Sequence, residues 1–296
     1  MFEVKKAKKG NGPDGTVNRQ GATCLACKNA VPFDHIRDEG KAGRMSAQLM
    51  AIVTEGQNGR NYHAPTSEHE AAAQVAIPAN VPDTDLPEQA LGFRVQLYGM
   101  TKHRDLFTPR QLTALTTFSD LVTEARAQIQ ADALAVGLSS DCIPFRNGGA
   151  GAMAYAEALS SYLALAYSNS TNYNSTLCGW NVSNENVKNT FSRQALPMTW
   201  DFAENHLLKG KLTVSAFVEW IALVLESYSI NNKLSFSTQQ DAVQPFNFEN
   251  IVLCTDPPYY DNIGYADLAD FLRLVADAAQ ITFSGSLFYI TCSKRT

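Results

Sequence analysis

The chain has 296 residues, 45% of them hydrophobic and 18% charged, a balance typical of a globular protein with one large domain or two smaller ones. Its formal net charge of −5 gives no overall basic signature, and no apolar run reaches the ~18 residues that a membrane-spanning helix needs. The charged N-terminus lacks the apolar core of a secretion signal, so we expect no membrane partner, a cytoplasmic location and reduced cysteines.

Two closely spaced cysteines stand near the start of the chain. The first 20 residues are rich in Gly, Lys and Asn and are predicted to be loop or a frayed strand. Cys24 and Cys27 follow at the spacing of a zinc knuckle. Because tetrahedral zinc needs four ligands, these thiols would form an incomplete metal site, and two incidental thiols remain the alternative.

Helix signals begin after the cysteine pair. Ser67 with Glu70 three residues later predicts a capping box and a short helix. Thr108, Pro109 and Gln111 then provide the N-cap, the first helical residue and the box partner of a long helix, for which the apolar spacing predicts roughly 25 residues.

Two further helices are predicted over residues 151–167 and 213–228, with an irregular stretch rich in Pro, Trp and polar groups between them. Gly149 and Gly151, just before the first of these helices, imitate the spacing of a nucleotide-binding loop. No buried strand precedes them, so we expect a loop that leads into the helix.

The motif that carries chemistry follows the clearest buried strand, the Ile-Val-Leu-Cys run at 251–254. A rigid loop comes next, formed by Asp256, Pro257, Pro258 and Tyr259. The prolines fix φ and prevent a strand or helix from continuing. The acid and the aromatic ring are therefore predicted just beyond the carboxyl end of a strand, where open α/β sheets bind ligands.

Methyl transfer to an exocyclic amine of a base would use these residue types. The lone pair of such an amine is delocalised into the ring, so two acceptors aimed at its hydrogens favour a tetrahedral nitrogen as charge develops. The Asp256 carboxylate and the Pro257 carbonyl would supply those acceptors, and Tyr259 would stack on a base flipped out of the duplex. The alternative is a proline turn without a catalytic role.

Four stretches together resemble the family of large adenine-specific DNA methylases that contain a zinc ribbon. They are GRMSAQLMAIVTEGQNGRNY (43–62), LGFRVQLYGMTKHRDLFTPRQL (91–112), TFSRQALPMTWDFAE (190–204) and DPPYYDNIGYADL (256–268). The resemblance covers about residues 10–271. It implies a Rossmann-like α/β methyltransferase fold, present here only in part, within a chain that is itself mainly α-helical with few short strands.

The resemblance also implies the chemistry: N6-methylation of adenine in DNA, with S-adenosylmethionine as methyl donor and zinc as a structural metal. It divides the chain into a partial zinc-ribbon-like segment, a helical insertion for target recognition, a catalytic strand with the DPPY loop, and a tail; these are residues 1–65, 66–245, 246–271 and 272–296. No F-x-G-x-G cofactor loop occurs in these residues. We therefore expect a fragment that is inactive alone and has an upstream-encoded methyltransferase half as partner.

The tail departs from the family after Phe271. Codons for residues 271–296 can be chosen so that reading one base later gives FYVWLRTLLKSLFPDLFSTLLVPKE, which resembles the family's continuation. We therefore expect an out-of-frame tail from about Leu272, a hypothesis that the nucleotide sequence decides.

The remaining candidate residues flank the motif or lie in the insertion. Tyr260, Asn262 and Tyr265 are expected to shape the base pocket. Arg193 and Trp200 are candidates for a phosphate contact and a wedge against bases, although a buried Trp and an acid-paired Arg are the simpler expectation. No cofactor-binding residue is assigned. A non-catalytic nucleic-acid-binding remnant and a pseudogene product stay open as alternatives.

Overall fold

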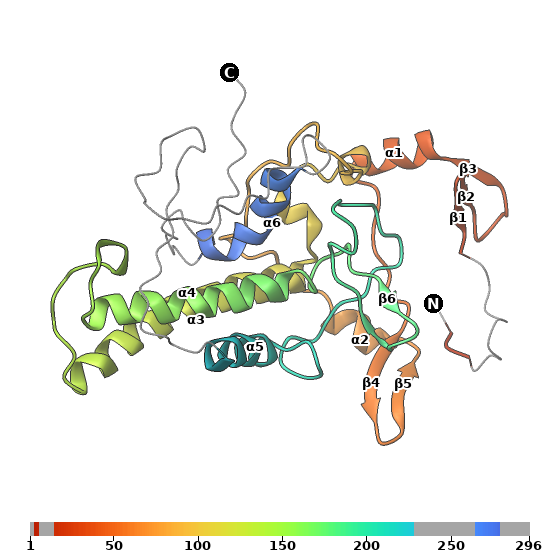
Figure 1. Ribbon diagram of the computed structural model, residues 1–296. Helices are drawn as coiled ribbons and strands as arrows, with labels where there is room; N and C mark the ends of the chain where they lie inside the picture. The colour runs from red at the N-terminus through yellow and green to blue at the C-terminus, as the bar shows by residue number, and fades with distance from the viewer. Residues whose placement is uncertain (1–2, 6–14, 228–263, 279–296) are drawn as a thin grey trace, which may run out of the picture.

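The computed structural model describes residues 3–5, 15–227 and 264–278. This part of the chain is mostly helical with a few short antiparallel strands, as the sequence predicts (Figure 1). The predicted strand at 251–254 and the DPPY loop lie outside the described residues. None of the described helices combines the length and the apolar character of a membrane span.

Short antiparallel strands build the N-terminal part. The first sheet has the order β1-β2-β3 and leads into helix α1; a separate hairpin, β4–β5, precedes helix α2. The bounds are β1 Val17–Asn18, β2 Gly21–Thr23, β3 Ala30–Pro32, α1 Phe33–Lys41, β4 Ile52–Gly56, β5 Gly59–His63 and α2 Ser67–Ala72.

The predicted cap of the short helix is wrong by one residue. Thr66, not Ser67, is the N-cap of α2, and His69 takes the place expected for Glu70. The Thr66 Oγ1 accepts from the His69 backbone N–H at 3.3 Å, and the Thr66 N–H donates to His69 Nδ1 at 3.2 Å. Thr66 is extended, as an N-cap must be, so the helix begins one residue before the Ser-Glu pair could cap it.

Helices dominate the rest of the described chain. The bounds are 3-10 helices η1 Val95–Tyr98, η2 His103–Leu106 and η3 Phe145–Asn147, α-helices α3 Pro109–Ala135, α4 Ala152–Thr171, α5 Val214–Ser227 and α6 Tyr265–Ala278, and strands β6 Trp180–Asn181 and β7 Asn186–Val187. The long helix α3 confirms the prediction: the Thr108 Oγ1 accepts from the Gln111 N–H, and the Thr108 N–H donates to the Gln111 side chain at 2.8 Å.

The long helices α3 and α4 lie side by side and form the frame on which the other helices pack. Helices α5 and α6 both contact α4, and Figure 1 shows them on opposite sides of the α3–α4 pair. The core gathers at one end of this pair, where loop residues from 86–107 and 177–207 meet side chains of α3, α4 and α6. Burial of these apolar groups is the main stabilising contribution.

Two glycines set the contact between the N-terminal part and this core. Helix α1 crosses η1 at Gly40 and Gly99. A Cβ added at Gly40 would lie 2.5 Å from the Tyr98 carbonyl oxygen, and one added at Gly99 would lie 2.5 Å from the Gly40 carbonyl oxygen. Gly99 also has φ +87°, a conformation that glycine adopts without steric cost. Neither position therefore accommodates a side chain.

Gly99 combines a positive φ with a close backbone contact. Gly99→Ala is therefore expected to destabilise the protein more than a Gly→Ala change at a position that has only a positive φ. Gly137 is the matched control because its φ is +92° but nothing lies within 4 Å of an added Cβ. The free energy of unfolding of both Ala variants should fall by about 1–2 kcal/mol, because alanine is strained in a left-handed conformation. For Gly99→Ala it should fall by a further ~1–3 kcal/mol, because the added Cβ overpacks the contact. Urea unfolding measures both, and equal losses would show that the α1–η1 crossing is not tight.

Candidate functional site

The structure describes five of the candidate site residues. Arg193, Trp200, Cys24 and Cys27 are in place, and Tyr265 is the half-buried first residue of α6. The other candidates lie outside the described residues: Asp256, Pro257, Pro258, Tyr259, Tyr260 and Asn262. The described element that follows the motif in sequence is helix α6.

Helix α6 is anchored by an aromatic cluster. The Phe271 ring stacks on Phe107 with centroids 5.6 Å apart and meets Phe191 edge-on at 5.1 Å. Phe271 is fully buried. The Ser168 hydroxyl on α4 also donates a hydrogen bond to the Leu272 carbonyl of α6. Helix α6 is thus fixed to α4, to the start of α3 and to the stretch at 190–204.

The stretch at 190–204 carries two of the candidate DNA-contacting residues, and both side chains are exposed. Trp200 keeps 38% of its surface exposed and packs edge-on against Tyr98, with centroids 5.2 Å apart. The simpler expectation of a buried Trp is therefore wrong. Arg193 is exposed and makes no side-chain hydrogen bond or ion pair with the described part of the chain. An aromatic ring and a cation therefore lie open on one loop.

Arg110 is already committed to a structural role. Its guanidinium donates to both carboxylate oxygens of Glu204, at 2.9 Å and 2.5 Å, and to the Ala73 carbonyl. The Glu204 partner raises the pKa of Arg110. This bidentate pair ties the end of α2 and the 190–204 stretch to the start of α3. The guanidinium is therefore not free for a phosphate.

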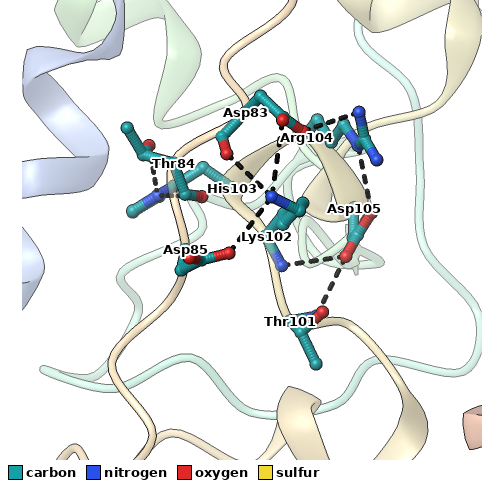
Figure 2. A network of polar contacts seen from close by, with 8 residues as sticks. All are labelled: Asp83, Thr84, Asp85, Thr101, Lys102, His103, Arg104 and Asp105. Carbon is teal, nitrogen blue, oxygen red and sulfur yellow. Dashed lines mark hydrogen bonds and ion pairs between the residues drawn. The ribbon is translucent and has the colours of Figure 1, made fainter.

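A charged network that sequence reasoning missed joins residues 83–85 to residues 101–105 (Figure 2). Lys102 Nζ lies 3.4 Å from an Asp83 carboxylate oxygen and 3.2 Å from Asp85, and Arg104 pairs with Asp83 at 2.6 Å. Asp105 accepts the Lys102 backbone N–H at 2.9 Å. The pKa of Lys102 is raised chiefly by its hydrogen bond to Asp85 and, to a smaller extent, by its hydrogen bond to Asp83. These cations neutralise neighbouring acids and add no basic surface.

His103 lies buried within this network. Its Nδ1 is 3.2 Å from the Thr84 carbonyl oxygen and 3.0 Å from the Thr84 hydroxyl. A carbonyl only accepts, so the proton is on Nδ1; Nε2 has no partner within the described ranges. Burial lowers the pKa of His103, and the Asp270 carboxylate on α6 opposes that effect. A charged imidazole is therefore disfavoured here.

The cysteine pair forms a turn between β2 and β3 in which Lys28 adopts a left-handed φ of +63°. The Lys28 N–H donates to the Cys24 carbonyl and the Cys24 N–H to the Asn29 carbonyl, both at 2.9 Å. Hydrogen bonds from the backbone N–H groups of Cys27 and Ala26 lower the pKa of Cys24. The turn therefore favours the thiolate, the form that binds metals.

The described thiols do not complete a zinc site. No group of three or more His, Cys, Asp or Glu side chains in the described residues is arranged to hold a metal. Cys24 and Cys27 supply at most half of a tetrahedral set.

The described glycines do not form a cofactor loop either. Gly151 is the N-cap of α4, and a Cβ on Gly149 would lie 2.0 Å from the Ile143 carbonyl oxygen. These glycines allow close packing of a loop that leads into the helix, as predicted, and none of the three glycines at 148–151 follows a strand.

The shallow depression of about 570 Å³ between β4, β5 and α2 contains none of the predicted site residues. His63 Nε2 lies 3.0 Å from the Thr54 hydroxyl, and His69 Nδ1 lies 3.0 Å from the Thr66 hydroxyl. Both histidines thus support local structure, so the depression adds no reactive group to the candidate site.

The burial of His103 predicts a pH dependence of stability. Its folded pKa is below the ordinary 6.5, so the unfolded chain takes up the proton first as pH falls. Its contribution to the free energy of unfolding is fully present above about pH 6.5 and is lost as the pH falls through the folded pKa. His103→Asn, which keeps a donor for Thr84, should make stability fall less steeply than in wild type from about pH 7 to 5. Urea unfolding across pH tests this, with exposed His35→Asn as control; identical slopes for all three proteins would contradict it.

The hydrogen-bonded turn predicts selective thiol chemistry. At about neutral pH, iodoacetamide should alkylate Cys24 faster than the exposed Cys142, because a lower pKa gives more thiolate. Cys24 is the less accessible of the two, so accessibility alone predicts the reverse order. Peptide mass spectrometry after short exposures to iodoacetamide measures both rates. Faster labelling of Cys142 would disprove that the turn activates the Cys24 thiol.

Comparison with known proteins gives no match of this chain to a family model, to a curated protein or to a solved structure.

Proposed function

We propose that this chain is the recognition and DPPY-bearing part of an S-adenosylmethionine-dependent, adenine-specific (N6) DNA methyltransferase with a Rossmann-like catalytic fold. One observation carries the proposal: segments that resemble the methylase family, though far apart in sequence, meet in one core. Phe107 belongs to the second resembling stretch and Phe191 to the third. Both pack on Phe271, which lies three residues beyond the stretch that begins with DPPY.

The first stretch is attached to the same body. Tyr62 at the end of that stretch meets Trp180 edge-on at 6.3 Å and donates a hydrogen bond to Glu185 at 3.1 Å. Arg60 donates to the Glu185 carbonyl at 3.4 Å. Chance similarities at scattered positions have no reason to lie together, so this convergence supports a shared ancestry of all four stretches.

The proposed chemistry assigns a separate task to each motif residue. The Asp256 carboxylate and the Pro257 carbonyl accept hydrogen bonds from the N6 amino group, and the amine nitrogen becomes more basic as it pyramidalises. Pro258 keeps the loop rigid. Tyr259 stacks on the flipped adenine, and Tyr260, Asn262 and Tyr265 line the pocket beside it.

The 190–204 loop is proposed as part of the DNA contact. Arg193, which has no ion-pair partner among the described residues, would contact a phosphate, and the exposed edge of Trp200 a base or sugar. Nearby Arg104 and Arg110 are paired with acids and are assigned no DNA contact.

The cofactor and the metal need residues that the described part of this chain does not supply. We propose that an upstream-encoded half contributes the glycine loop for S-adenosylmethionine and the second cysteine pair for zinc. When bound, S-adenosylmethionine supplies an electrophilic methyl group.

A second candidate function is nucleic-acid binding without catalysis, which the free Arg193 and the exposed Trp200 favour. It predicts that Asp256→Ala leaves DNA binding and its salt dependence unchanged while Arg193→Ala weakens binding. A pseudogene product would instead yield no detectable protein in cells.

The proposed methyltransferase is tested by supplying the missing half. The chain and the protein encoded immediately upstream are produced together and incubated with S-adenosylmethionine and adenine-containing duplex DNA. Mass spectrometry should find N6-methyladenine with both proteins and none with this chain alone. Asp256→Asn should lower the rate roughly 10²–10³-fold because an oriented acceptor is lost.

Asp120→Asn serves as the matched control, since Asp120 is an exposed acid on α3 and belongs to none of the four resembling stretches. It should retain the wild-type rate. Undiminished methylation by Asp256→Asn would refute the assigned role of the motif, and no methylation by the paired proteins would refute the proposed function.

A further inference from the structure

Helix α5 exposes an apolar face that the described chain leaves uncovered. One side of α5 packs on α4 through Phe217, which is fully buried and lies against Tyr173 with ring centroids 5.7 Å apart. The C-terminal half of the same helix carries Trp220, Leu223 and Val224, which are 46%, 61% and 58% exposed, and the Trp220 ring meets Phe217 edge-on at 5.0 Å. The apolar surface of α5 therefore continues beyond its contact with α4 and is left open by the described residues.

The charges around this face argue against nucleic acid as its occupant. The residues from Trp220 to Leu225 carry no charge, and Glu219 and Glu226 border them. Acids at both ends repel phosphates, while the uncharged apolar surface between them favours an apolar polypeptide.

We propose that the Ile-Val-Leu-Cys segment of this same chain, residues 251–254, docks on the Trp220–Leu223–Val224 face of α5. This segment is the longest uninterrupted apolar run within residues 228–263. Strands that are buried on both faces have such continuous apolar sequences, and a helix layer covers each face. The proposal depends on the strand prediction and does not require methyltransferase activity.

The chain connections permit this contact. Ser227 ends α5, and 23 residues separate it from Ile251; ten residues separate Cys254 from Tyr265 at the start of α6. Because α5 and α6 lie on opposite sides of the α3–α4 pair (Figure 1), the return path must cross about two helix diameters, or ~20 Å. Ten extended residues reach ~33 Å.

Tethering favours this segment over a second copy of the protein. A segment joined to α5 by a short linker has an effective concentration in the millimolar range. A second copy competes at its actual concentration, which is micromolar in an ordinary assay. The intramolecular contact therefore dominates unless the segment has little affinity for the face.

Cys254 within the segment gives a direct test on the full chain. In the wild type, maleimide should label Cys254 about tenfold or more slowly than the exposed Cys142, because docking buries it. Leu223→Asp places a charge in the face and should raise the labelling rate of Cys254 about tenfold, as expected when ~1.4 kcal/mol of docking is lost. Peptide mass spectrometry follows both thiols in one sample.

Leu121→Asp is the matched control, since Leu121 is another exposed leucine on a helix, 46% exposed on α3. It should leave Cys254 protected. Leu223→Gln, with good helix propensity, should give the same result as Leu223→Asp if the aspartate variant fails to fold.

Three outcomes would overturn the proposal. Cys254 could react as fast as Cys142 in the wild type, or it could remain protected in both Leu223 variants. Size-exclusion chromatography with light scattering could also show a wild-type dimer that Leu223→Asp converts to a monomer, which would identify a second copy as the occupant.

Discussion

The contact of Phe271 with Phe107 and Phe191 is the interaction on which the described structure depends most. It brings together three stretches that are separated by 80 or more residues in the sequence. A buried aromatic ring contributes both transferred apolar area and specific edge and face contacts. Because Phe271 lies on α6, the same cluster that stabilises the core also fixes the helix that follows the DPPY motif in sequence.

Several cations in the described part of the chain serve internal organisation. Lys102, Arg104 and Arg110 each pair with carboxylates and join loop segments to one another. Partly exposed pairs of this kind contribute little stability each, but their geometry fixes the direction of the chain. Arg193, on the same stretch as Trp200, has no such partner among the described residues, so the proposed DNA contact depends on few groups. An acidic protein that binds nucleic acid must concentrate its cations locally, and the remaining partners would have to come from outside the described residues.

Local signals predicted the helices well, because they depend on neighbours in the sequence. Thr108, Pro109 and Gln111 specified the start of α3, and the helices at 152–171 and 214–227 begin within one residue of their predicted starts. The cap at Thr66 was missed because two overlapping boxes compete there and only the backbone conformation decides between them. The network around His103 and the exposure of Trp200 were not predictable, since both depend on contacts between distant segments. The motif at Asp256 remains a sequence prediction.

The far end of the α3–α4 hairpin has a practical consequence. Residues 136–151 join the two long helices away from the main apolar cluster, and Figure 1 shows this turn projecting beyond the rest of the described chain. Val136 and Phe145 there are largely solvent-facing. Surface turns remote from a core tolerate added length. A rigid fusion partner grafted into this turn would enlarge the particle for electron microscopy while leaving the aromatic cluster and the 190–204 stretch untouched.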